Sequence, residues 1–356
     1  MTLKQAKPTN IRPRLHSAKS DWAAACAQSR PIVRQILQEP HRCFAEADGT
    51  INSLTTRYRH MNQSSFEGVE GIRIFTREWQ PAGKPRGVVV ISHGLNAHSG
   101  LYEWAAQQLT ANGLAVYALD HRGRGKSGGE RFFVKKFADW TEDLATFINI
   151  VKVREPGLPV FLLGHSAGGV IACGYALEHQ DEIAGLICED FAYKVPVPDI
   201  VLTITKGISH IAPHARVFKL KNEDFSRDPA IVAAMNADPL IAGESQPSET
   251  MAELARADEL LEKSLGRITL PVLILHGTAD KVTLPSGSKE FFEKAGSRDK
   301  TLKLYDGYFH DLLADVGKQQ VMADIQAWID AHLQGVAPDL GARPIVAGSV
   351  SHGQPT

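Results

Sequence analysis

The stretch PVFLLGHSAGG at residues 159–169 decides the fold. Its first half is a continuous apolar run, which is typical of a strand buried on both faces of a parallel sheet. Its second half contains the motif GHSAG (164–168), and helical spacing begins at Ala167. A serine on a sharp turn between a buried strand and a helix is the setting of a nucleophile elbow, where small neighbours let the backbones approach. A simple helix N-cap at Ser166 is the alternative, but the preceding strand disfavours it.

Strands and helices alternate on both sides of this motif. Continuous apolar runs predict buried strands, and helical spacing predicts the helices between them. The expected strands are 71–79, 87–94, 114–120, 159–166, 183–190, 271–277 and 301–307, and the expected helices are 101–112, 135–153, 167–179 and 319–333. Connections of this kind make strands parallel and place helices on both faces of the sheet, so the sequence predicts an α/β fold.

Three segments depart from this alternation. Residues 191–266 contain several prolines and an apolar cluster, which predicts helices inserted at the carboxyl ends of the strands, where ligands bind. Residues 1–62 match no core and predict an N-terminal extension, with a helix over 21–38 as its one candidate element. Residues 335–356 are rich in Gly, Pro, Ser and Ala and predict a disordered tail. The main domain is therefore expected to span residues 63–334.

Composition excludes several classes of protein. The 356 residues carry a net charge of −1, with a pI near 6.9, whereas nucleic-acid binders are usually strongly basic. No secretory signal and no apolar run of about 18 residues is recognisable, so we expect a cytoplasmic protein, with peripheral membrane association as the alternative. The four cysteines fit no zinc pattern and are expected to be buried thiols. The sequence does not predict an oligomeric state.

Two further residues complete a catalytic pattern with Ser166. A serine hydroxyl needs a base to activate it, and the base needs an acid to orient it. Asp280 follows the strand at 271–277, and His310 follows the strand at 301–307. The chain order Ser, Asp, His, with each residue after its own strand, is that of an α/β-hydrolase triad. We therefore expect Ser166 to be the nucleophile, His310 the base and Asp280 the acid.

The same motif suggests where an oxyanion would be stabilised. One backbone N–H should come from Ala167, directly after the nucleophile, and a second from Leu95 in the loop after strand 87–94. Neither a metal nor a cofactor is expected, because no H-E-x-x-H or comparable ligand set occurs. His93 and His98 are interpreted as structural. The Gly-rich loop at 120–127 lacks phosphate-loop spacing and is interpreted as a turn.

These residues resemble the monoacylglycerol lipase branch of the α/β-hydrolases, which also includes bacterial lysophospholipase-like enzymes and is of the serine aminopeptidase S33 type. The resemblance covers about residues 65–333. It rests on His93-Gly94, His98-Ser99-Gly100, Tyr102, Asp120, Gly123, Gly125, Ser127, Gly129-Glu130-Arg131, the run PGLPVFLLGHS at 156–166, and Asp238-Pro239-Leu240. Shared runs of this length are specific.

The resemblance implies the α/β-hydrolase fold: a mostly parallel eight-stranded sheet with helices on both faces and an inserted helical cap. It further implies a cap that contacts membranes and opens onto an acyl tunnel, a role that residues 191–266 would fill. The expected substrate is a small lipid-like carboxylic ester, cleaved through an acyl-enzyme on Ser166. The expected substrate-binding residues are His165, Ala97, Leu101 and Tyr193.

Ala97 and Leu101 depart from the family. Monoacylglycerol lipases typically have a Glu just before the His-Ser-Gly run and an Arg just after it, where this chain has Ala97 and Leu101. A carboxylesterase or lysophospholipase acting on a less polar leaving group is therefore the alternative function. An aminopeptidase or thioesterase is a further one, since Glu189 and Asp190 are candidates to hold an amino terminus. A hydrolase fold that binds ligands without catalysis is the last alternative.

Overall fold

The computed structural model describes residues 61–334 and the backbone of residues 345–347. The expected N-terminal extension lies outside the described residues except for its last two positions, and the helix expected over 21–38 lies outside them entirely. The described residues thus contain the whole of the expected main domain, residues 63–334.

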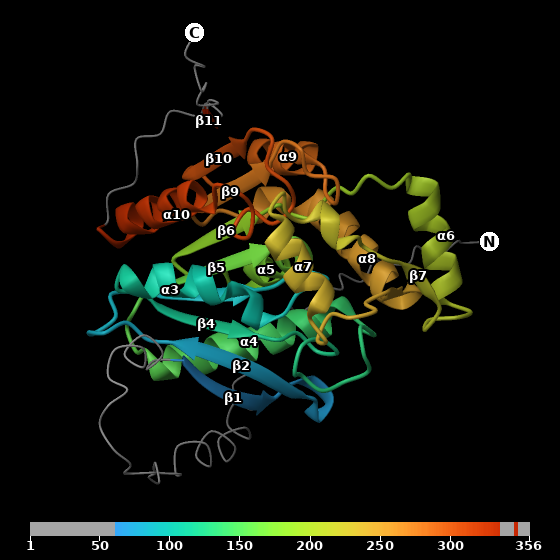
Figure 1. Cartoon of the computed structure of the whole chain (residues 1–356), viewed down its shortest axis with the longest axis horizontal. Helices are drawn as coiled ribbons and strands as arrows, with labels where there is room; N and C mark the ends of the chain where they lie inside the picture. Colours follow the sequence, from blue (N-terminus) through green and yellow to red (C-terminus); the bar gives the residue numbers. More distant parts are fainter. Residues whose placement is uncertain (1–60, 335–344, 348–356) are drawn as a thin grey trace, which may run out of the picture. The chain divides into compact units, whose positions relative to one another are not determined.

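A nine-stranded sheet forms the centre of the described chain, in the order β1-β2-β4-β3-β5-β6-β9-β10-β11 (Figure 1). Its strands are β1 (Met61–Glu67), β2 (Arg73–Trp79), β3 (Val88–Ser92), β4 (Ala115–Leu119), β5 (Val160–His165), β6 (Gly185–Glu189), β9 (Val272–Gly277), β10 (Lys300–Tyr305) and β11 (Ile345–Ala347). Every neighbouring pair from β4 to β11 is parallel, whereas β2 is antiparallel to both β1 and β4. The first eight of these strands form the predicted mostly parallel sheet.

The ninth strand corrects one expectation. Residues 345–347 form β11 and pair in parallel with β10, although the composition of 335–356 predicts a tail without structure. The short run Ile-Val-Ala favours an extended strand, and β10 would otherwise leave an unpaired edge for it to join. The rest of the expected tail beyond Gln334 lies outside the described residues.

Helices cover both faces of the sheet, because alternate strand residues point to opposite sides. Val88 and Val90 pack into one core cluster, while Val89 and Ile91 pack into another. The first cluster contains residues of α4 (Phe137–Arg154), α5 (Ala167–His179), α8 (Ser248–Ser264) and α9 (Pro285–Lys294), and the second contains residues of α3 (Glu103–Ala111) and α10 (Lys318–Leu333). Two apolar layers therefore clamp the sheet, as the buried strand runs predict.

β1 and α9 also escaped the sequence analysis. β1 is polar, and six of its seven residues are exposed, so only Phe66 reaches the core. Its pairing with β2, with Phe66 opposite Ile74, makes it a strand despite its composition. α9 is short and carries a single fully buried phenylalanine, Phe291, which contributes little periodic signal. Both elements depend on tertiary pairing more than on local pattern.

The segment between β6 and β9 forms the predicted helical cap. It contains α6 (Asp199–Ser209), α7 (Pro229–Ala237) and α8, together with a small two-stranded sheet of β7 (Arg216–Phe218) and β8 (Gln246–Pro247). Figure 1 shows α6 and β7 on the right of the view, away from α3 and α10. Among the residues described, no helix has the length and apolar character needed to cross a membrane.

Candidate active site

Ser166 lies at the turn between β5 and α5. Its φ of 55° is positive, a conformation that is uncommon for any residue but glycine and that persists only where surrounding structure holds it. Gly168 lies so close to β3 that an added Cβ would come within 2.0 Å of the Ser92 carbonyl oxygen. At Gly94, an added Cβ would lie 2.8 Å from the Cβ of Ser166. Glycine at both positions therefore lets the loop after β3 lie against the serine.

Ser166, His310 and Asp280 form one continuous chain of hydrogen bonds. The His310 Nε2 lies 2.9 Å from the Ser166 Oγ, and the His310 Nδ1 lies 2.8 Å from the Asp280 Oδ2. Both partners stand where the sequence places them, in the loops after β9 and β10. All three residues are buried. The arrangement can deprotonate the hydroxyl and hold the resulting imidazolium against a carboxylate.

Asp280 is held in place by Thr283, a residue that the sequence analysis did not single out. The Thr283 hydroxyl donates to Asp280 Oδ2 at 2.6 Å, and the backbone N–H groups of Val282 and Thr283 donate to Oδ1. An Asp whose side chain accepts from backbone two and three residues ahead is a recognisable local turn. The pattern Asp-x-x-Thr after β9 was therefore the available signal.

The charge of the site is concentrated on Asp280. Burial alone would raise the pKa of Asp280, but the charge of His310 and hydrogen bonds from His276 and His310 outweigh it and hold the pKa far below its usual range. Asp190, by contrast, has its pKa raised well above the usual range by burial and by the negative charges of Asp280 and Glu189. The pKa values of these two neighbouring carboxyl groups are thus shifted in opposite directions. Asp280 is the one whose surroundings favour the ionised form beside His310.

Glu189 and Asp190 do not present carboxylates to a substrate. Both side chains are fully buried. Glu189 Oε1 accepts from the backbone N–H of Leu313, and Asp190 Oδ1 accepts from the backbone N–H of Gly277. The two residues therefore tie the end of β6 to the loops that carry His310 and Asp280, and neither borders the cavity beside Ser166.

Leu95 and Ala167, the expected oxyanion donors, both border a cavity that also contains Ser166. The loop that carries Leu95 is held by the cap. The backbone N–H of Asn96, at a φ of 50°, donates to Glu244 Oε1 at 3.0 Å. Glu244 is itself buried in an ion pair with Arg124, and His98 bonds Asp238 of the cap.

The contacts of Asn96 and Glu244 were missed by sequence reasoning, because they join positions far apart in the chain. The only available signal was the Asp238-Pro239-Leu240 run, which lies near Glu244 in sequence. Asn96 and Glu244 make the position of the loop that carries Leu95 dependent on the position of the cap.

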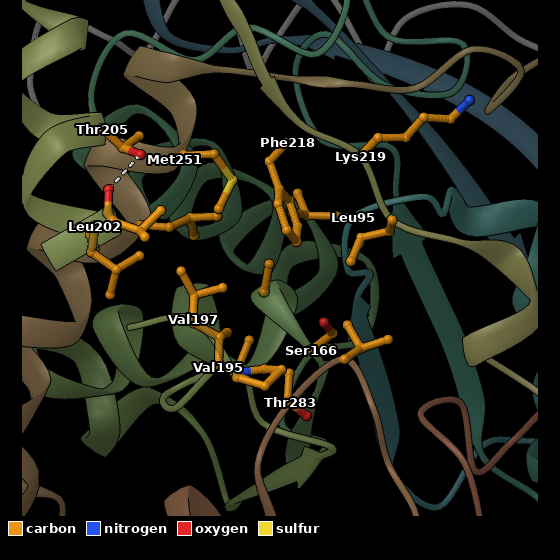
Figure 2. A pocket seen from close by; sticks show the side chains of 18 of the residues that line it. Leu95, Ser166, Val195, Val197, Leu202, Thr205, Phe218, Lys219, Met251 and Thr283 are labelled. Carbon is orange, nitrogen blue, oxygen red and sulfur yellow. Dashed lines mark hydrogen bonds between the residues drawn. The ribbon is translucent and has the colours of Figure 1, made fainter. Parts of the chain in front are cut away.

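The cavity beside Ser166 has a volume of about 290 Å³, and its wall is largely apolar. Figure 2 shows Ser166 and Leu95 on one side and Leu202, Thr205 and Met251 on the other. The lining side chains come mainly from the cap: Val195, Pro196, Val197, Val201, Leu202, Val217, Phe218, Leu220, Met251, Leu254 and Ala255. Such a cavity suits a hydrocarbon chain.

The four residues expected to bind substrate do not line this cavity. His165 is fully buried, and its ring accepts from the Tyr102 hydroxyl and donates to the His310 carbonyl oxygen, so that it supports the His310 loop. Tyr193 packs in the core, and its hydroxyl donates to Glu290. Ala97 is buried, and Leu101 packs against the cluster around α3 and α10. The cavity wall thus comes mainly from the cap and not from the positions that lie near the catalytic motifs in sequence.

One group of side chains has the spacing of metal ligands. Asp190, Asp280 and His310 offer ligand atoms within 4.8 Å of one another. Asp280 and His310 are already bonded to each other, and His310 is bonded to Ser166. The geometry is that of a base with its acid. The expectation that the site works without a metal stays a prediction.

Comparisons with known proteins agree with this geometry. A model of the family described as Serine aminopeptidase, S33, matches residues 83–317. A monoacylglycerol lipase of Mycolicibacterium smegmatis is 34% identical over 281 residues, which are 78% of this chain and 99% of the relative. The monoglyceride lipase of Homo sapiens is 33% identical over 265 residues, 73% of this chain and 88% of the relative.

Solved structures point the same way. The crystal structure of a monoacylglycerol lipase from Paleococcus ferrophilus has a TM-score of 0.67 and 30% identity, and covers 73% of this chain and 99% of that one. A soluble variant of the monoglyceride lipase of Saccharomyces cerevisiae, in complex with a substrate analogue, has a TM-score of 0.70 and 25% identity over 76% of this chain and 94% of that one. The chain belongs to this α/β-hydrolase family and is a serine ester hydrolase of the monoacylglycerol lipase-like type.

Proposed function

We propose that the chain hydrolyses esters of lipid-like acyl chains, with monoacylglycerols as the first candidate substrates. The observation that carries this proposal is the hydrogen-bonded chain from Ser166 through His310 to Asp280, which opens directly onto an apolar cavity. A nucleophile beside a hydrocarbon-lined cavity favours a substrate whose acyl group is long and apolar. The names of the relatives, lipases of monoacylglycerols, support the same substrate class.

The geometry suggests the order of proton transfers. His310 Nε2 takes the proton of Ser166 Oγ as the oxygen attacks the ester carbonyl carbon, and Asp280 stabilises the imidazolium. The oxyanion accepts hydrogen bonds from the N–H groups of Leu95 and Ala167. His310 then gives the proton to the leaving alcohol, which leaves the acyl group bonded to Ser166. A water molecule activated by His310 releases the acid in the second half of the cycle.

Residues 191–266 serve in this proposal as the cap that meets the lipid surface. α6 has two apolar faces: Val201 and Leu202 border the cavity, whereas Ile200 and Ile204 are 64% and 54% exposed. Ile211, just after the helix, is 89% exposed. Exposed apolar side chains next to the cavity of a lipid-ester hydrolase suit insertion into a lipid surface, from which a substrate would pass into the cavity.

A less polar leaving group is the second candidate, because Ala97 and Leu101 stand where the family typically has charged residues. Both side chains are uncharged, so they offer no charged pair to bind glycerol. Neither residue borders the cavity. This alternative predicts that esters of simple alcohols are cleaved as well as glycerol esters. The aminopeptidase alternative loses its support, since the buried Glu189 and Asp190 are bonded to backbone.

A substrate panel tests the proposal. Monoacylglycerols, p-nitrophenyl esters of rising chain length, lysophospholipids and aminoacyl amides would be compared with the wild type and Ser166→Ala. We expect kcat/KM to rise with acyl length and to vanish in Ser166→Ala. Equal rates on glycerol and simple alkyl esters would favour the carboxylesterase alternative. Turnover of aminoacyl amides but not of esters would overturn the proposal.

A further inference from the structure

One face of α8 carries an acidic residue into the apolar cavity. Met251, Leu254, Ala255 and Asp258 all border the cavity. Their spacing of three, four and seven residues places them on one side of the helix. Three of the four are apolar, as the rest of the wall predicts, so Asp258 is the exception on this face.

Asp258 lacks the partners that a buried carboxyl group normally has. Its Oδ1 is buried and finds no hydrogen-bond partner among the described residues. An unpaired polar atom away from water costs free energy, and native proteins leave few of them. A buried, unpartnered oxygen at the edge of a substrate cavity is explained if the substrate supplies the partner.

The setting of Asp258 favours the protonated, neutral form of its carboxyl group. Burial raises its pKa well above the usual range, and the negative charge of Glu259 adds to the effect. A protonated carboxyl group both donates one hydrogen bond and accepts others. The matching group is a neutral oxygen on an otherwise apolar chain, such as a hydroxyl or an oxo group. A cationic ligand would require the carboxylate form, which the apolar surroundings disfavour.

We propose that Asp258 forms a polar subsite that hydrogen-bonds a hydroxyl or oxo group on the acyl chain, so that oxygenated acyl esters are preferred substrates. This inference rests on the proposed function, because it takes the chain in the cavity to be the acyl group of an ester. The subsite selects the position of the oxygen along the chain, since Asp258 is fixed on α8 while the ester carbon is fixed at Ser166. The rest of the wall, which is largely apolar although Lys219, Lys221, Asp224 and Lys281 also border the cavity, binds the hydrocarbon on either side of that oxygen.

The test uses p-nitrophenyl esters of one medium-chain acid, unsubstituted and with a single hydroxyl placed at successive carbons. We expect the wild type to show a maximum in kcat/KM at one hydroxyl position. Asp258→Leu, an apolar residue of similar size, should lower kcat/KM for that ester about tenfold more than for the unsubstituted ester, the usual value of one hydrogen bond. Asp258→Asn, which keeps both a donor and an acceptor, should restore most of the preference.

Met251→Leu is the matched control, because it exchanges one apolar residue for another on the same helix face. It should change the rates of all esters alike. Labelling by a fluorophosphonate at the wild-type rate would show that each variant is folded at its active site. Cleavage of all the esters at equal rates by the wild-type protein would overturn the subsite but not the proposed function. A preference for one hydroxyl position that survives in Asp258→Leu would do the same. Cleavage of no ester at all would overturn both.

Discussion

The two sides of the cavity beside Ser166 are built in different ways. On the sheet side, Ser166, His310 and Asp280 are fixed by short hydrogen bonds in the loops that follow β5, β10 and β9. On the cap side, α6 and α8 present apolar side chains, and Asp258 Oδ1 has no hydrogen-bond partner within the part of the chain that the structure describes. We therefore expect the sheet side to set the reaction and the cap side to select the substrate.

The largest expected effect distinguishes two buried carboxyl groups on the sheet side. Asp280→Asn should lower kcat by a factor of roughly 10⁴, because the amide cannot stabilise the His310 imidazolium and favours the wrong tautomer. Asp190→Asn is the matched control, since burial raises the pKa of Asp190 and an amide oxygen can still accept from the backbone N–H of Gly277. We expect less than a tenfold loss there. Steady-state rates on a p-nitrophenyl ester would measure both, and similar losses would contradict the assignment of the acid.

The second prediction concerns the link between the two sides. Glu244→Gln should destabilise the protein by about 3 kcal/mol, because it leaves the buried guanidinium of Arg124 without its charge partner. It should also lower kcat more than it changes KM, through the bond to Asn96 in the oxyanion loop. Denaturant unfolding and ester kinetics are the measurements.

Glu182→Gln provides the comparison for Glu244→Gln, because its ion pair with Lys152 is partly exposed. It should cost less than about 1 kcal/mol. Equal destabilisation by the two changes would mean that the Arg124–Glu244 pair does not hold the cap to the loop.

The third prediction addresses the outer face of the cap. The double change Ile200→Glu and Ile204→Glu should lower the rate on monoacylglycerol in vesicles about tenfold, since charged side chains oppose insertion into lipid. The rate on a water-soluble short-chain ester should stay the same. Val153→Glu, at an equally exposed apolar position on α4, should change neither rate. A loss on both substrates would place the two isoleucines in folding or catalysis instead.

The smallest effect is a pH dependence of stability. The pKa of Asp280 is lowered in the folded protein, so its carboxylate stabilises the fold above the pKa of about 3.9 that Asp has when unfolded, and this stabilisation is lost as the pH falls. The difference in unfolding free energy between the wild type and Asp280→Asn should therefore shrink by about 1 kcal/mol from pH 7 to pH 3. A difference that grows on acidification would have the wrong sign for an ionised Asp280.

The same contrast explains what the sequence could predict. Ser166 directly follows β5, and Asp280 and His310 lie in the loops after β9 and β10, so local pattern and chain order were enough to place them. The β1 strand is too polar to be recognised before its pairing with β2 is known. Long-range contacts within the cap and to it, such as Glu244 with Asn96, join positions far apart in the chain and carry little local signal.

The cavity wall was the least predictable part. His165, Ala97, Leu101 and Tyr193 were chosen for their closeness to motifs, but none of them borders the cavity. The lining comes mainly from the loops, β7 and the helices of the cap, whose arrangement depends on how these elements pack together. Asp258 could have been noticed as an acid at apolar spacing on α8, but only once that face was known to border a cavity.

The central claim is that Ser166 is the residue that becomes acylated, and peptide mass spectrometry after reaction with a fluorophosphonate tests it most directly. We predict that the added mass is found on the peptide that contains Ser166 and that Ser166→Ala neither takes up the reagent nor hydrolyses p-nitrophenyl esters. Label on another residue, or ester turnover that persists in Ser166→Ala, would contradict the account.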